Sequence, residues 1–153
     1  MIPVYTKLSY LALLIIAVML QACTSNKKIY MSDCDENITF KHVTYAHLID
    51  SIAFYDQKYI EVSGKYQEGK EESALINDSL FVSQSKTALW VNFSQDCPLY
   101  LSGTRIGFFE YNNGGFTRIN NKTVKLRGRL DVHNKGHLKL YKACIDRVSF
   151  IEL

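Results

Sequence analysis

Apolar residues along this chain follow three patterns, and each pattern predicts a different kind of element. Residues 11–20 (LALLIIAVML) form an unbroken apolar run. Further on, apolar residues recur at the three- and four-residue spacing of one helix face, at Tyr45, Leu48, Ile49 and Ile52. Thr44 stands where the N-cap of that short helix would lie. From residue 58 onward the period is two, which is typical of β-strands.

Six segments in the second part of the chain have the pattern of strands. Residues 58–67 (KYIEVSGKYQ) alternate around Gly64, which indicates a bulge or a tight bend. Residues 71–76 (EESALI) and 79–83 (SLFVS) form either one bent strand or a small hairpin. The other three strand segments are 88–93 (ALWVNF), which is apolar on both faces and so predicted to be central, 122–133 (KTVKLRGRLDVH) and 137–153.

These strands predict an all-β domain over residues 42–153. The ten tyrosines, eight phenylalanines and two prolines of the chain agree with that class. Residues 94–121 contain Pro98 and four glycines without an amphipathic pattern, which makes them a long connection between the third and fourth strands. A bent first strand and such an insertion predict a five-stranded OB-like barrel with one short N-terminal helix. A small β-sandwich or another barrel topology is the alternative.

The N-terminal apolar run is the wrong length for a membrane span. A spanning helix needs about 20 apolar residues, whereas the h-region of a signal peptide needs roughly 7–15. Lys7 gives the preceding segment a positive charge, and Leu20-Gln21-Ala22-Cys23 follows the run. This arrangement resembles the signal peptide and lipobox of bacterial lipoproteins. The alternative is a soluble protein whose first helix happens to be apolar.

The lipobox resemblance implies that residues 1–22 are removed and that the mature chain begins at a lipidated Cys23. Residues 23–41 would then be a flexible tether holding the domain off the bilayer. Thr24 follows the cysteine where an aspartate would favour retention at the inner membrane, so the resemblance implies the outer membrane. The mature chain would carry 17 basic and 15 acidic residues. That near-neutral balance gives no support to a nucleic-acid-binding role.

Three further cysteines, Cys34, Cys97 and Cys144, would lie in an oxidising compartment, where one disulfide is expected. Three pairings are possible. We favour Cys97–Cys144, because both fall in the folded region while Cys34 lies in the predicted tether. The chain has no C-x-x-C motif, so nothing supports a thioredoxin-like activity.

The strand segments also share motifs with a known group of proteins. They contain K-Y-x-x-V-x-G at 58–64, E-E-S-A-L at 71–75, Trp90 between aliphatic residues, and G-H-L at 136–138. The pattern, which covers 54–93 and 122–153, resembles a group of small bacterial proteins that carry an OB-like domain and have no assigned activity. The resemblance implies the fold and leaves the activity open.

Few residues suggest chemistry. His133 and His137 are four apart, but Gly136 and the strand pattern place them in a turn, and no further ligands follow at zinc-like spacing, so we expect no metal and no cofactor. Glu71 and Glu72 could act as an acid–base pair only if placed around a substrate. We expect instead a structural polar cluster in which one carboxylate pairs with His137, or with a neighbouring cation, and the other is solvated.

A basic stripe is the best binding candidate in the sequence. Lys125, Arg127 and Arg129 would emerge on one face of a strand about 7 Å apart, and Lys139 and Tyr141 could extend that face. Such a surface could take an anionic envelope polymer, a lipid headgroup or an acidic protein, or it could be an ordinary solvated face. Trp90, Phe81 and Tyr66 could stack nucleic-acid bases, but Trp90 fits a core position and an envelope location argues against nucleic acid.

The sequence therefore favours a non-catalytic binding or interaction module that is lipid-anchored in the cell envelope. A structural subunit of an envelope complex is the first alternative. An enzyme acting on envelope polymers, with Glu71, Glu72 and His137 as its acid–base set, is the second.

Overall fold

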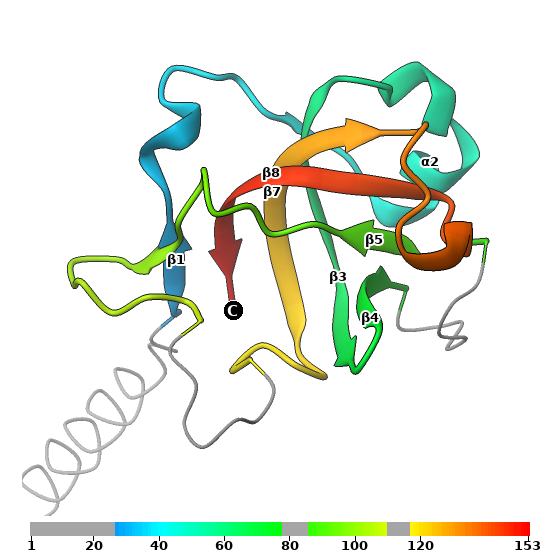
Figure 1. The fold of residues 1–153 in the computed structure, drawn as a ribbon. Coiled ribbons are helices and arrows are strands. Elements are labelled where there is room, and N and C mark those ends of the chain that lie inside the picture. Colours follow the sequence, from blue (N-terminus) through cyan, green and yellow to red (C-terminus); the bar gives the residue numbers. More distant parts are fainter. Residues whose placement is uncertain (1–26, 78–85, 110–116) are drawn as a thin grey trace, which may run out of the picture.

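The computed structural model describes residues 27–77, 86–109 and 117–153. Strands dominate, and the long strands β3, β7 and β8 curl around the centre of the molecule, with β1 on one side and α2 on the other (Figure 1). The strands are β1 (Ile29–Met31), β2 (Lys41–His42), β3 (Tyr59–Gly69), β4 (Glu72–Ile76), β5 (Leu89–Val91), β6 (Tyr100–Leu101), β7 (Thr123–Asp131) and β8 (Ala143–Glu152). The helical elements are α2 (Tyr45–Asp50) and the 3-10 turns η1 (Asp33–Asp35), η2 (Ile52–Tyr55) and η3 (His137–Lys139).

Five of the strands close into a barrel. β3 pairs with β4, β4 with β5, β5 with β8, β8 with β7, and β7 returns to β3. The β5–β8 pairing is parallel and the other four are antiparallel. This arrangement confirms the predicted five-stranded OB-like barrel. β5 lies between β4 and β8, which confirms the central position expected from its two apolar faces.

Alternation of buried and outward residues builds the barrel from the sequence. In β7 the inward positions include Val124, Leu126 and Leu130, all buried. Gly128 takes the remaining inward position, where an added Cβ would lie 2.7 Å from the carbonyl oxygen of Asp146 on β8. Gly64 of β3 has a similar role, since its Cβ would lie 2.8 Å from the oxygen of Ile76. Both glycines thus permit strand approaches that a side chain would block.

The predicted helix is present. The Thr44 hydroxyl caps it by accepting from the backbone N–H of His47 at 3.4 Å. Tyr45 and Leu48 are buried in the main core, and the Tyr45 hydroxyl lies 2.8 Å from the carbonyl oxygens of Leu75 and Thr87. Burial raises the pKa of Tyr45 well above its ordinary value. The helix is therefore fastened to the barrel by both packing and a hydrogen bond.

The predicted tether is wrong from residue 28 onward. β1 pairs antiparallel with β8, and Tyr30 is buried in the core. Leu153 donates a backbone hydrogen bond to Lys28 at 3.0 Å, so the chain is part of the fold almost from the first described residue. A three-residue strand is too short to show a period in the sequence, which is why this segment reads as a linker.

The predicted disulfide is also wrong. Cys34 bonds to Cys97, with their Cα atoms 5.3 Å apart, and Cys144 is free and buried on β8. The observed pairing follows from the docking of β1 on β8, which carries Cys34 onto the domain beside Cys97. Burial raises the pKa of the Cys144 thiol to about 12, so this thiol is protonated and unreactive in the folded protein.

Candidate functional site

The predicted basic stripe exists, but its charges are neutralised from within the sheet. Each cation has a carboxylate as its direct cross-strand partner on a neighbouring strand. The partner of Lys125, for example, is Glu152. Lys125 Nζ lies 3.3 Å from Glu152, and Arg127 Nε donates to Glu61 at 2.7 Å. Although burial opposes ionisation, the hydrogen bond and charge of Arg127 lower the pKa of the Glu61 carboxyl.

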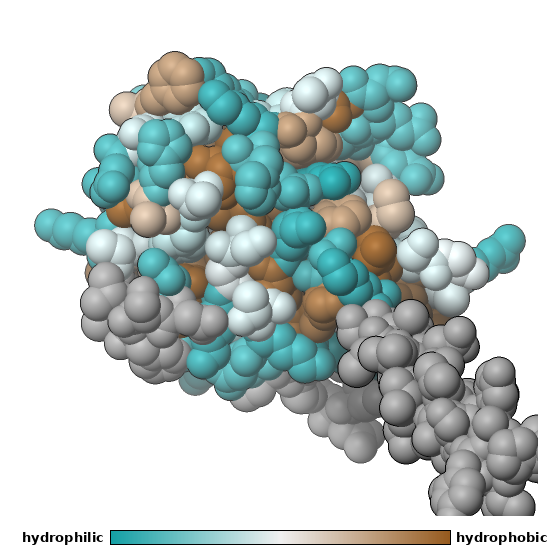
Figure 2. Space-filling view, turned by 180° about the vertical axis from the view of Figure 1, so that it is seen from behind, coloured by the Kyte–Doolittle hydropathy of each residue, from teal (hydrophilic) through white to brown (hydrophobic). Residues whose placement is uncertain are grey.

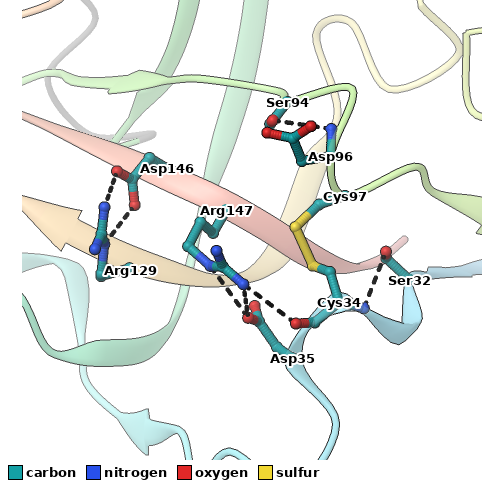
Figure 3. A network of polar contacts seen from close by, with 9 residues as sticks. All are labelled: Ser32, Cys34, Asp35, Ser94, Asp96, Cys97, Arg129, Asp146 and Arg147. Atoms are coloured by element: carbon teal, nitrogen blue, oxygen red, sulfur yellow. Dashed lines mark hydrogen bonds and ion pairs between the residues drawn. A yellow bond between two sulfur atoms is a disulfide. The ribbon is translucent and has the colours of Figure 1, made fainter.

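Arg129 is also paired with a carboxylate on the adjacent strand, through two hydrogen bonds. Its Nε and one terminal nitrogen donate to the two oxygens of Asp146 at 3.0 and 2.8 Å (Figure 3). These two residues are cross-strand partners in the register of β7 and β8, and the hydrogen bonds that Arg129 donates to Asp146 raise the pKa of the guanidinium. The stripe is therefore a set of ion pairs within the sheet, and its cations are already engaged by carboxylates of the same domain.

The two residues expected to extend the stripe do not reach it. Lys139 is exposed but belongs to η3, before β8 begins. Tyr141 is only 3% exposed, and its ring lies 5.1 Å from that of Trp90. Trp90 itself is half-buried on the outside of the barrel, while Tyr66 is in the core. Phe81 lies outside the described residues.

The histidines and glutamates are in part as expected. His137 Nε2 lies 3.3 Å from Glu71 Oε2, which confirms that one carboxylate of the cluster pairs with this histidine. His133 instead approaches Asp56, also at 3.3 Å, so the two histidines are directed to different carboxylates. The expectation of a solvated Glu72 holds only in part, because this residue is half-buried. Its Oε1 is buried without a hydrogen-bond partner among the described residues, and burial raises its pKa.

Glu72 belongs to a layer of side chains on the outer surface of β4, centred on Ala74. Gln67 of β3 and Trp90 of β5 are the register partners of Ala74 on its two sides. Since alternate residues of a strand share a face, Glu72 lies on the same side, and Tyr141 covers the layer from the β7–β8 connection. We refer to Gln67, Glu72, Ala74, Trp90 and Tyr141 as the Ala74 face.

The connection that covers this face has an unusual backbone. Gly136, Leu138 and Lys139 all have positive φ angles, of 64°, 51° and 59°. A Cβ on Gly136 would lie 2.6 Å from the Trp90 ring, so only glycine fits against the indole here. Leu138 is 72% exposed at the outside of the loop. Sequence reasoning missed this layer, although the Gly-His-Leu and aliphatic-Trp-aliphatic motifs together mark both of its sides.

A groove of about 860 Å³ runs along the opposite side of the domain. It is lined by residues of β1, η1 and the 96–105 segment, among them Met31, Asp33, Asp96, Pro98, Tyr100 and Arg105. Met31 and Tyr100 are cross-strand partners and are 47% and 46% exposed. Ile106 and Phe109, in the following segment, are exposed as well. From behind, hydrophobic areas interrupt the hydrophilic surface across the visible face (Figure 2).

One wall of this β1–β6 groove is held by several independent bonds. Cys34 is fixed by its disulfide to Cys97, and its backbone N–H donates to the Ser32 hydroxyl at 3.4 Å. Arg147 reaches from β8 to the Cys34 carbonyl and to Asp35 Oδ1, both at 3.2 Å (Figure 3). The groove is therefore pre-formed. Its residues come from a segment without any readable period, which explains why the sequence did not reveal it.

No family model, curated protein or solved structure matches this chain in our comparisons. Cys23 and the predicted signal peptide lie outside the described residues. Among the helices of the described part, none has the length and apolarity needed to cross a bilayer.

Proposed function

We propose that this protein is a non-catalytic interaction module, anchored in the cell envelope through a lipid on Cys23, that docks an envelope protein in the β1–β6 groove. The observation that carries the proposal is the pairing of exposed apolar side chains with a pre-formed groove. Exposed apolar patches of this kind mark interaction sites in soluble domains. The cross-strand pair Met31 and Tyr100 supplies an apolar ridge, while Asp33, Asp96 and Arg105 provide polar contacts at its border.

The position of the groove supports a partner at the membrane. Met31 is eight residues from Cys23, which at about 3.5 Å per residue places it within roughly 28 Å of a lipid attached there. A partner that fits is an envelope protein that presents an apolar segment close to the bilayer surface. The polar cluster argues against an enzyme of the predicted kind, since Glu71 and His137 contact each other while Glu72 is directed into the Ala74 face.

Photo-crosslinking in intact cells tests the docking. We expect a crosslinker at Tyr100 to give a discrete protein adduct, and one at Phe54 to give none. Phe54 is the matched control because it is an aromatic residue of similar exposure, 59%, on η2 away from the groove lining. Equal adducts from both positions, or none from Tyr100, would refute the proposed groove. A stoichiometric adduct that co-purifies as a stable complex would identify the protein as a structural subunit.

A separate experiment tests the anchor. In the envelope fraction, the mature chain should begin at an acylated Cys23, and Cys23→Ser should accumulate as the uncleaved precursor without lipid. Mass spectrometry of the N-terminal peptide distinguishes the two. An unmodified thiol at Cys23 in the mature protein would contradict the anchoring, whatever the crosslinking result.

A further inference from the structure

We propose that the Ala74 face is a second binding site, which takes a primary ammonium group beneath the 134–141 loop. Several side-chain oxygens without hydrogen-bond partners lie together on this face. Within the described ranges, four buried side-chain nitrogen or oxygen atoms lack a hydrogen-bond partner, and three belong to this face: Gln67 Oε1, Glu72 Oε1 and the Tyr141 hydroxyl. The fourth belongs to Asp35, whose other oxygen accepts from Arg147.

The register places these three groups around one small residue. Gln67 is directly opposite Ala74, and Glu72 precedes Ala74 by two positions on the same face. The Glu72 carboxylate lies beside its cross-strand partner Gly69, where an added Cβ would be 3.4 Å from Glu72 Oε2. Tyr141 packs with Ala74 in the same cluster, and the charge of Glu72 adds to burial in raising its pKa, which indicates that the two are close.

The chemistry of the three atoms selects the ligand. A carboxylate oxygen and an amide oxygen only accept hydrogen bonds, and a tyrosine hydroxyl can accept as well. A primary ammonium has three N–H donors and no acceptor, so it can satisfy all three at once. A ligand with a single hydroxyl could donate to only one of these oxygens. An anion would be repelled, because all three groups present lone pairs. The carboxylate of Glu72 also supplies the opposite charge, and the neighbouring rings of Trp90 and Tyr141 favour a cation.

The covering loop gives the ligand a route. Gly136 lies against the Trp90 ring, and the loop reaches the β3–β4 turn through the His137–Glu71 contact at the surface. Leu138 at the outside of the loop is exposed and is not part of either buried cluster. Because Tyr141 belongs to this loop, a displacement of the loop would uncover Trp90, Gln67 and Glu72 and would carry the Tyr141 hydroxyl with it. The loop thus acts as a cover, and an ammonium beneath it replaces three unsatisfied groups by three hydrogen bonds.

Trp90 is the single tryptophan of the chain, so its fluorescence reports on this face without a label. We would titrate the full-length mature protein in detergent with n-butylammonium chloride, and in parallel with tetramethylammonium chloride. We expect a saturable change in Trp90 emission with the primary ammonium only, because the quaternary ion carries the same charge without N–H donors. No saturable change, or an equal response to both ions, overturns the proposal.

Variants assign the effect to the named atoms. Glu72→Gln and Tyr141→Phe should each weaken n-butylammonium binding by about tenfold or more. Glu36→Gln, which removes the same charge from an exposed residue outside the Ala74 face and its covering loop, should bind as the original chain does. Glu72→Gln removes a partly buried charge and keeps the shape, so we expect the fold to be preserved, and a cooperative melting curve with a midpoint no lower than that of the original chain verifies this. Unchanged binding by both Glu72→Gln and Tyr141→Phe would show that the ion binds elsewhere.

Discussion

Removing the Cys34–Cys97 disulfide should cost this domain a large part of its stability. The bond joins residues separated by 63 positions. In the chain-entropy description, closing a loop of that length restricts the unfolded chain enough to stabilise the fold by about 4 kcal/mol. Domains of this size are stable by about 5–15 kcal/mol in total. The double variant Cys34→Ser, Cys97→Ser should therefore fold with a much reduced margin, and β1 should lose its fixed position beside β8.

Urea unfolding followed by Trp90 fluorescence measures this effect. With a dependence of about 2 kcal/mol per molar urea for a small domain, the midpoint should fall by about 2 M in the double variant. The original chain in the presence of a reductant should fall by the same amount. The control is Cys144→Ala, whose midpoint should still respond to the reductant because its disulfide is intact.

Three results would refute the reasoning. A reductant effect that persists in the double variant would mean that another pair of cysteines is bonded. A peptide map linking Cys97 to Cys144 would show the same directly. A loss below about 1 kcal/mol would contradict the entropic argument while leaving the pairing intact. Alkylation gives an independent check, because the buried Cys144, with its pKa raised to about 12, should react only after unfolding.

Other substitutions test the Ala74 face and the paired stripe. Burial raises the pKa of Glu72 above its unfolded value, so its ionisation costs stability as the pH rises through the folded pKa; Glu72→Gln should raise the melting temperature at pH 7 and leave it unchanged near pH 4. Gly136→Ala should destabilise the fold by about 1–3 kcal/mol and alter Trp90 emission, because it adds a methyl 2.6 Å from that ring at a φ of 64°; an unchanged spectrum would contradict the contact. Arg127→Ala should cost about 1 kcal/mol by removing the guanidinium from Glu61, which among the described residues would keep only its contact with His42, and a double-mutant cycle with Glu61→Gln should recover a coupling of similar size.

The barrel could be predicted because its strands are long enough to show their period. β7 alternates over nine residues and β5 is apolar on both faces, and these two features with the long connection were sufficient for the topology. The helix was predictable for the same reason, with Thr44 as its cap. β1 could not be predicted, since three residues carry no period and its stability comes from pairing with β8, over a hundred positions away. The disulfide and the β1–β6 groove could not be predicted either, because both depend on the position of β1.

The candidate site shows why charge alone misled the sequence analysis. A stripe of cations on a strand predicts a binding face only if the adjacent strands bring no carboxylates to it. In this barrel the register sets Glu61 opposite Arg127 and Asp146 opposite Arg129. Those carboxylates lie 66 and 17 positions away from their partners, so no local pattern could reveal them.

On β4, by contrast, the register leaves polar side chains without partners. The cross-strand partner of Glu72 is Gly69, which has no side chain to offer the carboxylate. Gln67 is opposite Ala74, which is equally unable to pair. A buried polar atom without a partner costs about 1–3 kcal/mol, so a fold that leaves three of them on one face forgoes stability that ordinary substitutions could restore. The paired β7 stripe is thus the part of the surface that stabilises the barrel. The unpaired Ala74 face is the part where a ligand would gain most by binding.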